Sequence, residues 1–445
     1  MLIPSLAVLL FSAVFFLMFV GKYDRRMVVV AGGTLFVLLG IVLDFYTLEM
    51  VWQSIYFETL ALIFSLTLIS STLAKSGYFQ VLAERVALYS RGDGWLILVL
   101  FSLITYFFSL FVNNLATMVV ILPVTLNLCM RAEINPVPVV IAQIVASNLG
   151  GASTMIGDFP NMIISAAGGL HFFDFIGGMM VPTLILLAVT LLFFQSKRRE
   201  IFAKSGVDKD GGGRTIDGFS GSGLLAEIRV NRKLLRIGTV SLFLTLGGFF
   251  LAELIEFSPA FIALIAGLLL LTVAGFQPKE LFVVTGGGDI LFFIGLFVMV
   301  GGLQAAGVLD SVSWLINRVS GGKPLFELLA LLWIAGLATP FMNAGPATAF
   351  FIPVADELSG FIPGDAVWWA LSLGVLAGSS ASLTGATAGS IAASQMDEHI
   401  KQNPEVLRNI PQKRRLDFRE YNRWGRPIMG LFLGISSLYI ILISP

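Results

Sequence analysis

The sequence predicts an all-α polytopic membrane protein made of two inverted-topology repeats of five transmembrane helices. Each repeat also carries a re-entrant hairpin and a broken helix. Apolar residues make up 56% of the 445 residues, whereas charged residues make up only 13%. Runs of about 20 apolar residues, long enough to span a bilayer, recur along the whole chain. Because these runs are continuous and do not alternate, helices satisfy the backbone groups inside the bilayer.

Ten transmembrane spans are expected, five in each repeat. The first repeat occupies residues 1–195 and the second residues 237–445. Residues 196–236 form a cytoplasmic linker whose centre, 205–223, is polar and glycine-rich. Since five crossings is an odd number, the second repeat is inverted relative to the first. The expected spans are 5–20, 27–46, 58–74, 137–168 and 172–195, followed by 237–255, 258–275, 288–304, 366–393 and 427–443.

Extra apolar sequence lies between the third and fourth span of each repeat. It contains an amphipathic stretch, at 78–91 and again at 308–321. A run broken by Asn and Gly follows, at 94–130 and 325–360. We interpret each broken run as a re-entrant hairpin that leaves the topology unchanged. The alternative is a pair of ordinary transmembrane helices in each repeat.

The positions of the basic residues predict the orientation of the chain. Lys22, Arg25 and Arg26 follow the first span directly. Short loops rich in Lys and Arg stay in the cytoplasm, so the amino terminus is expected outside and the first span is expected to be retained. With this topology, all basic residues fall in the cytoplasm except Arg318 and Lys323. We therefore expect a multi-pass protein of the inner (plasma) membrane.

Short motifs recur at a nearly constant spacing and indicate an internal repeat. Asn113 and Asn343 are each followed by an Ile-(Leu)-Pro-Val segment, and the same spacing separates the two asparagines and the two prolines. Gly157 and Gly385, in the broken helices, follow almost the same spacing. Inverted repeats place interrupted helices at the bilayer midplane, where substrate and coupling ions bind. The sequence therefore predicts a binding site to which each half of the chain contributes a matching set of motifs.

The hairpin tips carry amide and hydroxyl groups. A helix that begins at membrane depth offers free N–H groups and the positive end of its dipole. Asn adds a donor and an acceptor without a net charge. A simpler interpretation is that Asn113 and Asn343 only cap the returning helices. The candidate binding residues at the tips are Asn113, Asn114, Thr117, Asn343 and Thr348.

The broken helices combine glycines, which permit unwinding, with hydroxyl groups and freed carbonyls that suit sodium or a proton-bearing solute. Small residues of this kind also occur where helices merely pack together. The candidate binding residues here are Asn148, Ser153, Thr154, Gly157, Asp158, Asn161, Ser379, Ser380, Ser382, Thr384 and Thr387. A sodium ion is expected at Asn113, Ser153, Asn343 and Ser382.

Asp158 breaks the symmetry of the repeat because Ala386 stands at the matching position. An ionisable residue at membrane depth is a candidate proton carrier or cation ligand, and we expect Asp158 to bind the coupling ion. The alternative is that Asp158 caps the helix that begins at Phe159. No Arg or Lys lies in either motif, which disfavours phosphate-like substrates.

The sequence resembles the ion transporter superfamily, in particular its arsenite-efflux and sodium/proton-antiporter branch. That branch includes silicic-acid exporters and the P protein; the divalent anion:sodium symporters are more distant. The resemblance rests on Asn113-Asn114, the run 157–161 and a Leu-x-Phe-x-acid-aromatic motif at 170–175 and 416–421. It implies an elevator-type transport domain that slides against a scaffold domain, and a homodimer.

The expected function is secondary active transport, most simply proton-coupled efflux of a small inorganic hydroxylated solute or oxyanion such as arsenite or silicic acid. Sodium/proton antiport and sodium-coupled di- or tricarboxylate symport remain alternatives. No cofactor beyond Na⁺ or H⁺ is expected, and the partners are the solute and the lipid bilayer, not nucleic acid. Residues 286–289 formally match an intramembrane aspartyl protease pattern, but no second acid motif accompanies them, so an enzyme is not expected.

Overall fold

The computed structural model describes residues 2–20, 22–202, 230–254, 257–402 and 415–444, and the regular elements within these ranges are all helices. Nine helices in the described ranges are long and apolar enough to cross a membrane, and four further apolar helices are shorter. The predicted all-α polytopic fold class is confirmed. The predicted polar segment 205–223, and residues 403–414 of a basic insertion, lie outside the described residues.

The first half of the chain follows the predicted order of spans, with two unpredicted short helices: α3, which is capped by the Thr47 side chain, and α11, which lies in the predicted linker segment. Its helices are α1 (Leu2–Val20), α2 (Arg25–Val42), α3 (Leu48–Ser54), α4 (Phe57–Lys75), α5 (Tyr78–Tyr89), α6 (Gly94–Ser109), α7 (Asn114–Arg131), α8 (Pro136–Ala152), α9 (Phe159–Gly168), α10 (Phe172–Ser196) and α11 (Arg198–Phe202).

The second half repeats this order, with a short helix α14 before its third span. Its helices are α12 (Arg232–Leu254), α13 (Pro259–Ala274), α14 (Pro278–Val284), α15 (Gly287–Ala305), α16 (Val308–Ser320), α17 (Pro324–Met342), α18 (Ala344–Ser359), α19 (Ala366–Ser379), α20 (Gly389–Gln402) and α21 (Phe418–Ile443). The predicted spans 137–168 and 366–393 are both interrupted, as expected, between α8 and α9 and between α19 and α20.

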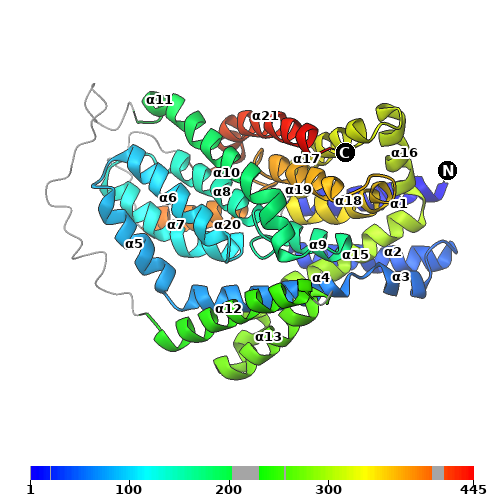
Figure 1. Cartoon of the computed structure of the whole chain (residues 1–445), viewed down its shortest axis with the longest axis horizontal. Coiled ribbons are helices and arrows are strands. Elements are labelled where there is room, and N and C mark those ends of the chain that lie inside the picture. Colours follow the sequence, from blue (N-terminus) through cyan, green and yellow to red (C-terminus); the bar gives the residue numbers. More distant parts are fainter. Residues whose placement is uncertain (1, 21, 203–229, 255–256, 403–414, 445) are drawn as a thin grey trace.

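Helices α8 and α19 form the centre of the molecule. Every residue of α19, and every residue of α8 after Pro136, is buried. Neither helix carries a charged residue, and helices that are apolar on all sides belong in the interior. Both run through the middle of the molecule in Figure 1. The hairpins and the second halves of the broken helices lie around this pair.

The first arm of each hairpin packs closely on the first half of the broken helix in its own repeat. A Cβ atom on Gly150 of α8 would lie 2.2 Å from the carbonyl oxygen of Tyr106 in α6. A Cβ atom on Gly378 of α19 would lie 2.3 Å from the carbonyl oxygen of Gly336 in α17. Gly378 corresponds to Gly150, and Gly336 to Tyr106, at the spacings that the sequence motifs follow.

A matched hydrogen bond fixes the start of each break. The Thr154 hydroxyl donates to the carbonyl of Leu110 at 2.7 Å, and the Ser382 hydroxyl donates to the carbonyl of Pro340 at 3.0 Å. Ser382 stands in the second half of the chain where Thr154 stands in the first half, and Pro340 stands where Leu110 does, at the spacings of the sequence motifs. The two halves therefore use equivalent residues to join hairpin and broken helix.

The remaining spans interlock the two halves. Helix α2 packs on α15, and α4 packs on α13, so the third span of each half contacts the second span of the other. Small residues allow both approaches. A Cβ atom on Gly33 would lie 3.0 Å from the carbonyl oxygen of Gly295, and one on Gly267 would lie 2.8 Å from the Ser65 hydroxyl.

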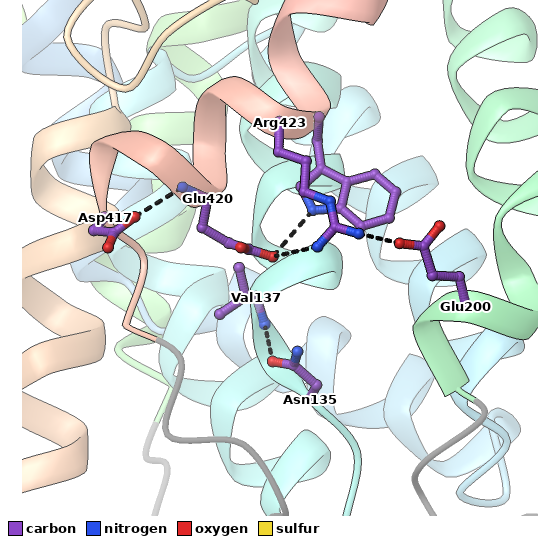
Figure 2. A network of polar contacts seen from close by, with 7 residues as sticks. Asn135, Val137, Glu200, Asp417, Glu420 and Arg423 are labelled. Atoms are coloured by element: carbon purple, nitrogen blue, oxygen red, sulfur yellow. Dashed lines mark hydrogen bonds and ion pairs between the residues drawn. The ribbon is translucent and has the colours of Figure 1, made fainter.

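One end of the molecule carries the ion pairs between described residues. In Figure 1, α5, α6 and α11 lie at the left end, and the amino terminus, α3 and α16 lie at the right end. Figure 2 shows part of the ion-paired end, where Arg423 of α21 contacts both Glu200 of α11 and Glu420. The other pairs of this end, which we call the ion-paired face, are Lys75–Glu280 at 2.8 Å, Arg198–Asp93 at 3.8 Å and Arg415–Asp397 at 3.9 Å.

The glycine run before Asp289 has a structural role. A Cβ atom on Gly288 would lie 2.3 Å from the guanidinium carbon of Arg26, so the Arg26 side chain packs directly on Gly288. Asp24 caps α2 by accepting a hydrogen bond from the backbone N–H of Arg26.

We predict that Gly150→Ala and Gly378→Ala each destabilise the protein, because the added methyl group would overlap a backbone carbonyl. Overpacking of this kind costs about 1–3 kcal/mol. Thermal unfolding in detergent measures the effect. Gly177→Ala in α10 is the matched control, since a Cβ there meets no atom within 4 Å. Equal melting temperatures for all three variants would contradict the packing described.

Candidate functional site

Asp158 lies where both broken helices and the first hairpin meet. Its side chain is 7% exposed. One carboxylate oxygen, Oδ2, accepts a hydrogen bond from the Asn114 amide at 2.8 Å. The other, Oδ1, accepts from the backbone N–H of Phe159 at 2.9 Å and from the Thr387 hydroxyl at 3.5 Å. Asp158 therefore does cap α9, but it is also held by α7 and by the second half of the chain.

Glycines allow the close approach that surrounds Asp158. A Cβ atom on Gly151 would lie 2.5 Å from Asn114 Oδ1 and 3.0 Å from the Asp158 Cβ. One on Gly157 would lie 2.3 Å from the carbonyl oxygen of Ser109 at the end of α6. Only glycine fits at these two positions, so the glycines bring the hairpin tip against the break between α8 and α9.

Asn161 holds the unwound backbone of the first break. Its amide nitrogen donates to the carbonyls of Ala152 at 2.9 Å and Thr154 at 2.8 Å. Its amide oxygen accepts from the Ser372 hydroxyl of α19 at 3.1 Å. Carbonyls freed by a break at membrane depth need such a donor, because no lipid group can replace it. Asn161 thus pairs the freed carbonyls of the first break and links the first half of the chain to α19 in the second half.

A chain of amide and hydroxyl groups joins the first hairpin to α19. The Asn114 amide donates to Asn148 Oδ1 at 3.4 Å, and the Asn148 amide donates to the Ser379 hydroxyl at 3.2 Å. The Ser109 hydroxyl donates to Asn114 Oδ1 and lies 3.3 Å from the Ser147 hydroxyl. These buried groups fix the direction of the Asn114 amide, which therefore donates to Asp158.

The second hairpin tip closes on its own break and has no acid. The Asn343 amide donates to the carbonyls of Thr384 at 3.0 Å and Ala386 at 3.4 Å. Thr384 and Ser382 hydroxyls both donate to the Pro340 carbonyl, at 3.1 and 3.0 Å. Asn343 adopts φ = 78° and ψ = 156°, and this positive φ is strained for a residue with a side chain.

Ser153 and Asn113, two of the residues predicted to hold sodium, have partners away from Asp158. The Ser153 hydroxyl lies 2.8 Å from the Tyr106 hydroxyl and 2.7 Å from the Thr183 hydroxyl. Asn113 caps α7 by accepting a backbone N–H of its first turn. The sodium site stays a prediction for the full set of Asn113, Ser153, Asn343 and Ser382.

Other predicted hydroxyl groups bond to nearby main-chain carbonyls and do not contact Asp158 through these bonds. They are Thr117 to Val112, Thr348 to Ala344 and Ser380 to Leu376. The structure therefore brings together a subset of the predicted residues around the acid: Asn114, Asn148, Gly157, Asp158, Asn161, Ser379 and Thr387.

A small cavity adjoins Asp158 and has room for about one water molecule. The polar residues that line it are Asp158, Asn161, Ser372 and Ser379, and Ala344 of the second hairpin also lines it. The sequence analysis missed Ser372. Its spacing could have revealed it, since Ser372 and Ser379 stand at i and i+7 and share one face of α19.

The donor set of the site contains one carboxylate together with amides and hydroxyls. In the described part of the chain, Asp158 has no Lys or Arg among its contacts. Nor do three or more His, Cys, Asp or Glu side chains gather anywhere in the described residues. Oxygen donors with a single negative charge suit a proton or a small hard cation.

Comparisons with known proteins point to a family of transporters. The family model described as "Citrate transporter" matches residues 13–374. Magnetosome protein MamN of Magnetospirillum gryphiswaldense is 44% identical over 443 residues, covering 98% of this chain and 98% of that protein. The human P protein is 26% identical over 476 residues, covering 91% of this chain and 55% of that protein.

A solved structure shows a similar fold. The YdaH transporter of Alcanivorax borkumensis has a TM-score of 0.56 and 13% identity, covering 87% of this chain and 86% of that chain. The predicted resemblance to the ion transporter superfamily and to the P protein is confirmed.

We predict that Asn343→Gly is more stable than Asn343→Ala, by about 1–3 kcal/mol, because glycine relieves the strain of the positive φ while both variants lose the side-chain amide. Both should transport less than the parent protein, since the second break loses its donor. Thermal unfolding in detergent and transport by proteoliposomes give the two readouts. Equal stability of the glycine and alanine variants would contradict the strained conformation at this tip.

Proposed function

The chain belongs to the citrate transporter family of membrane transporters, and we propose that it is a secondary active transporter in which Asp158 carries the coupling ion. The single observation that carries this proposal is the buried Asp158 carboxylate, contacted from the first hairpin and from the second broken helix. An acid at membrane depth is costly and belongs where it binds a proton or cation. Membership of a transporter family also supports a protein without enzymatic activity.

The size of the cavity supports a small ion. Room for about one water molecule suits a dehydrated monovalent cation or a proton carried by the acid. We therefore propose proton/cation exchange, with sodium as the cation, in which the two ions compete for Asp158. Free citrate, with three carboxylates, fits this site poorly. The groups that contact Asp158 are amide, hydroxyl and backbone N–H donors, and no basic side chain is among them to offset the charge of citrate.

Efflux of a neutral hydroxylated solute of the arsenite or silicic acid type is the second candidate. It is favoured by the amide and hydroxyl groups of Asn114, Asn148 and Ser379, which can donate to and accept from a solute rich in hydroxyls. In that case Asp158 would carry the proton that drives efflux. A sodium-coupled carboxylate symporter would need bound cations to offset the charge of its substrate.

The proposed mechanism uses the whole architecture. We propose that residues 1–195 and 237–445 are inverted repeats and that the hairpins and broken helices move as an elevator against α2, α4, α13 and α15, in a homodimer. The matched contacts of the two halves support the repeat. The gathering of ion pairs at one face supports a cytoplasmic location for that face, with the amino terminus outside the plasma membrane.

We predict that Asp158→Asn abolishes ion exchange, because the amide keeps the size of the side chain but cannot take up or release a proton. The measurement is proton movement in proteoliposomes under an imposed sodium gradient, read with a pH-sensitive dye. Asp310→Asn, which changes an exposed acid on α16, is the control and should transport normally.

Three outcomes separate the candidates. Sodium-driven proton movement that is lost in Asp158→Asn supports exchange. Proton movement that needs added arsenite or silicic acid supports the second candidate. Sodium-dependent uptake of a labelled dicarboxylate without proton movement, or full activity of Asp158→Asn, would overturn the proposed role of Asp158.

A further inference from the structure

The second halves of the two broken helices differ in their surroundings. In α9 every residue from Phe159 to Ser165 is buried. In α20 only Gly389, Ala392 and Met396 are buried. The two helices occupy matching places in the two halves of the chain. Their different burial therefore reflects the surroundings of each helix in the folded protein and its polarity.

Helix α20 has one polar, exposed face. Ser390, Ser394 and Glu398 are spaced at i, i+4 and i+8 and are all exposed. The buried residues lie on the opposite face, which packs on α7 and α8. A polar stripe that includes a carboxylate is costly against lipid tails, whereas water solvates it freely. The exposed face of α20 is therefore suited to an aqueous space.

This polar face connects Asp158 with the ion-paired face. At its inner end, the Thr387 hydroxyl lies 3.5 Å from the Asp158 carboxylate, two residues before α20 begins. Near its outer end, Asp397 pairs with Arg415 at 3.9 Å. The 14 residues of α20 span about 20 Å at 1.5 Å per residue, which covers the distance from the bilayer centre to its edge.

On the other side of Asp158 the structure is closed. Helix α9 packs against α4, α18 and α19. The ring of Phe159, which directly follows Asp158, lies 5.4 Å from the ring of Phe293 in α15. Apolar side chains thus lie between Asp158 and the end of the molecule that carries α3 and α16. On the opposite side of Asp158, α20 presents a polar face.

We propose that Ser390, Ser394 and Glu398 of α20 line an aqueous passage between Asp158 and the ion-paired face, and that the structure is the conformation open to that face. The proposal deepens the proposed function, because it names the route by which the ion reaches and leaves Asp158. In the opposite conformation, α20 would lie against the interlocked spans in the way that α9 lies here.

Cysteine labelling tests this passage without measuring transport. Cys129, the single cysteine, is buried, and it is first removed by the substitution Cys129→Ala. Ser390→Cys and Ser394→Cys are then exposed to a charged, membrane-impermeant maleimide in permeabilised membrane vesicles, so that both membrane surfaces are reached. The matched control is Met162→Cys in α9, a buried residue at the position that corresponds to Ser390 in the other half of the chain.

We expect both α20 variants to be labelled under conditions that leave Met162→Cys unlabelled. Labelling should persist when Asp158→Asn is added, because access does not require ion binding. Thiols on α20 that react with a lipid-soluble maleimide but not with the charged one would show a lipid-facing helix and overturn the passage. Thiols that react with neither reagent would show a face covered by protein and would overturn it equally.

The two proposals fail separately. If Asp158→Asn abolishes transport but the α20 thiols are inert to the charged maleimide, the passage is wrong and the coupling role of Asp158 stands. If the α20 thiols are labelled but Asp158→Asn transports normally, α20 lines an aqueous passage and the coupling role is wrong. Glu398→Cys, at the outer end of α20, is the positive control that shows the charged reagent reaches the ion-paired face of the vesicle protein.

Discussion

The need to satisfy backbone groups at membrane depth is the constraint on which the rest of this structure depends. Two helices are interrupted in the interior, and each interruption frees carbonyl groups that lipid cannot hydrate. One asparagine amide serves each break. Asn161 donates to the carbonyls of Ala152 and Thr154, and Asn343 donates to those of Thr384 and Ala386. Without these donors, the breaks beside Asp158 would carry unpaired carbonyl groups.

The two amides act from different parts of the fold, and this makes the site asymmetric. Asn161 belongs to the broken helix itself, so the first hairpin tip is free to direct the Asn114 amide at Asp158. Asn343 belongs to the hairpin tip, and its amide donates to the carbonyl of Thr384 in the second break. Two halves with matched contacts thus hold one acid, so no second carboxylate raises the cost of the negative charge at Asp158.

Charge is distributed over this molecule in a way that fits transport across a bilayer. The ion pairs of the described residues gather at one face, while the interior around Asp158 offers amides, hydroxyls and backbone N–H groups. Helix α20 is the exception, since its polar face runs outward from the neighbourhood of Asp158. Its partner α9 is enclosed. One molecule therefore presents an open side and a closed side to the same acid.

The sequence by itself determined the class of fold and the order of spans, and it singled out Asp158 as a candidate site residue. Apolar runs of bilayer length and paired Asn and Gly motifs depend on local composition and spacing, which a sequence displays directly. Only the tertiary structure decided which polar residues meet. Ser153 turns to Tyr106 and Thr183, while Ser372, absent from every motif, reaches Asn161. Helices α8 and α19 belong to different halves of the chain, so their contact depends on packing that no local pattern encodes.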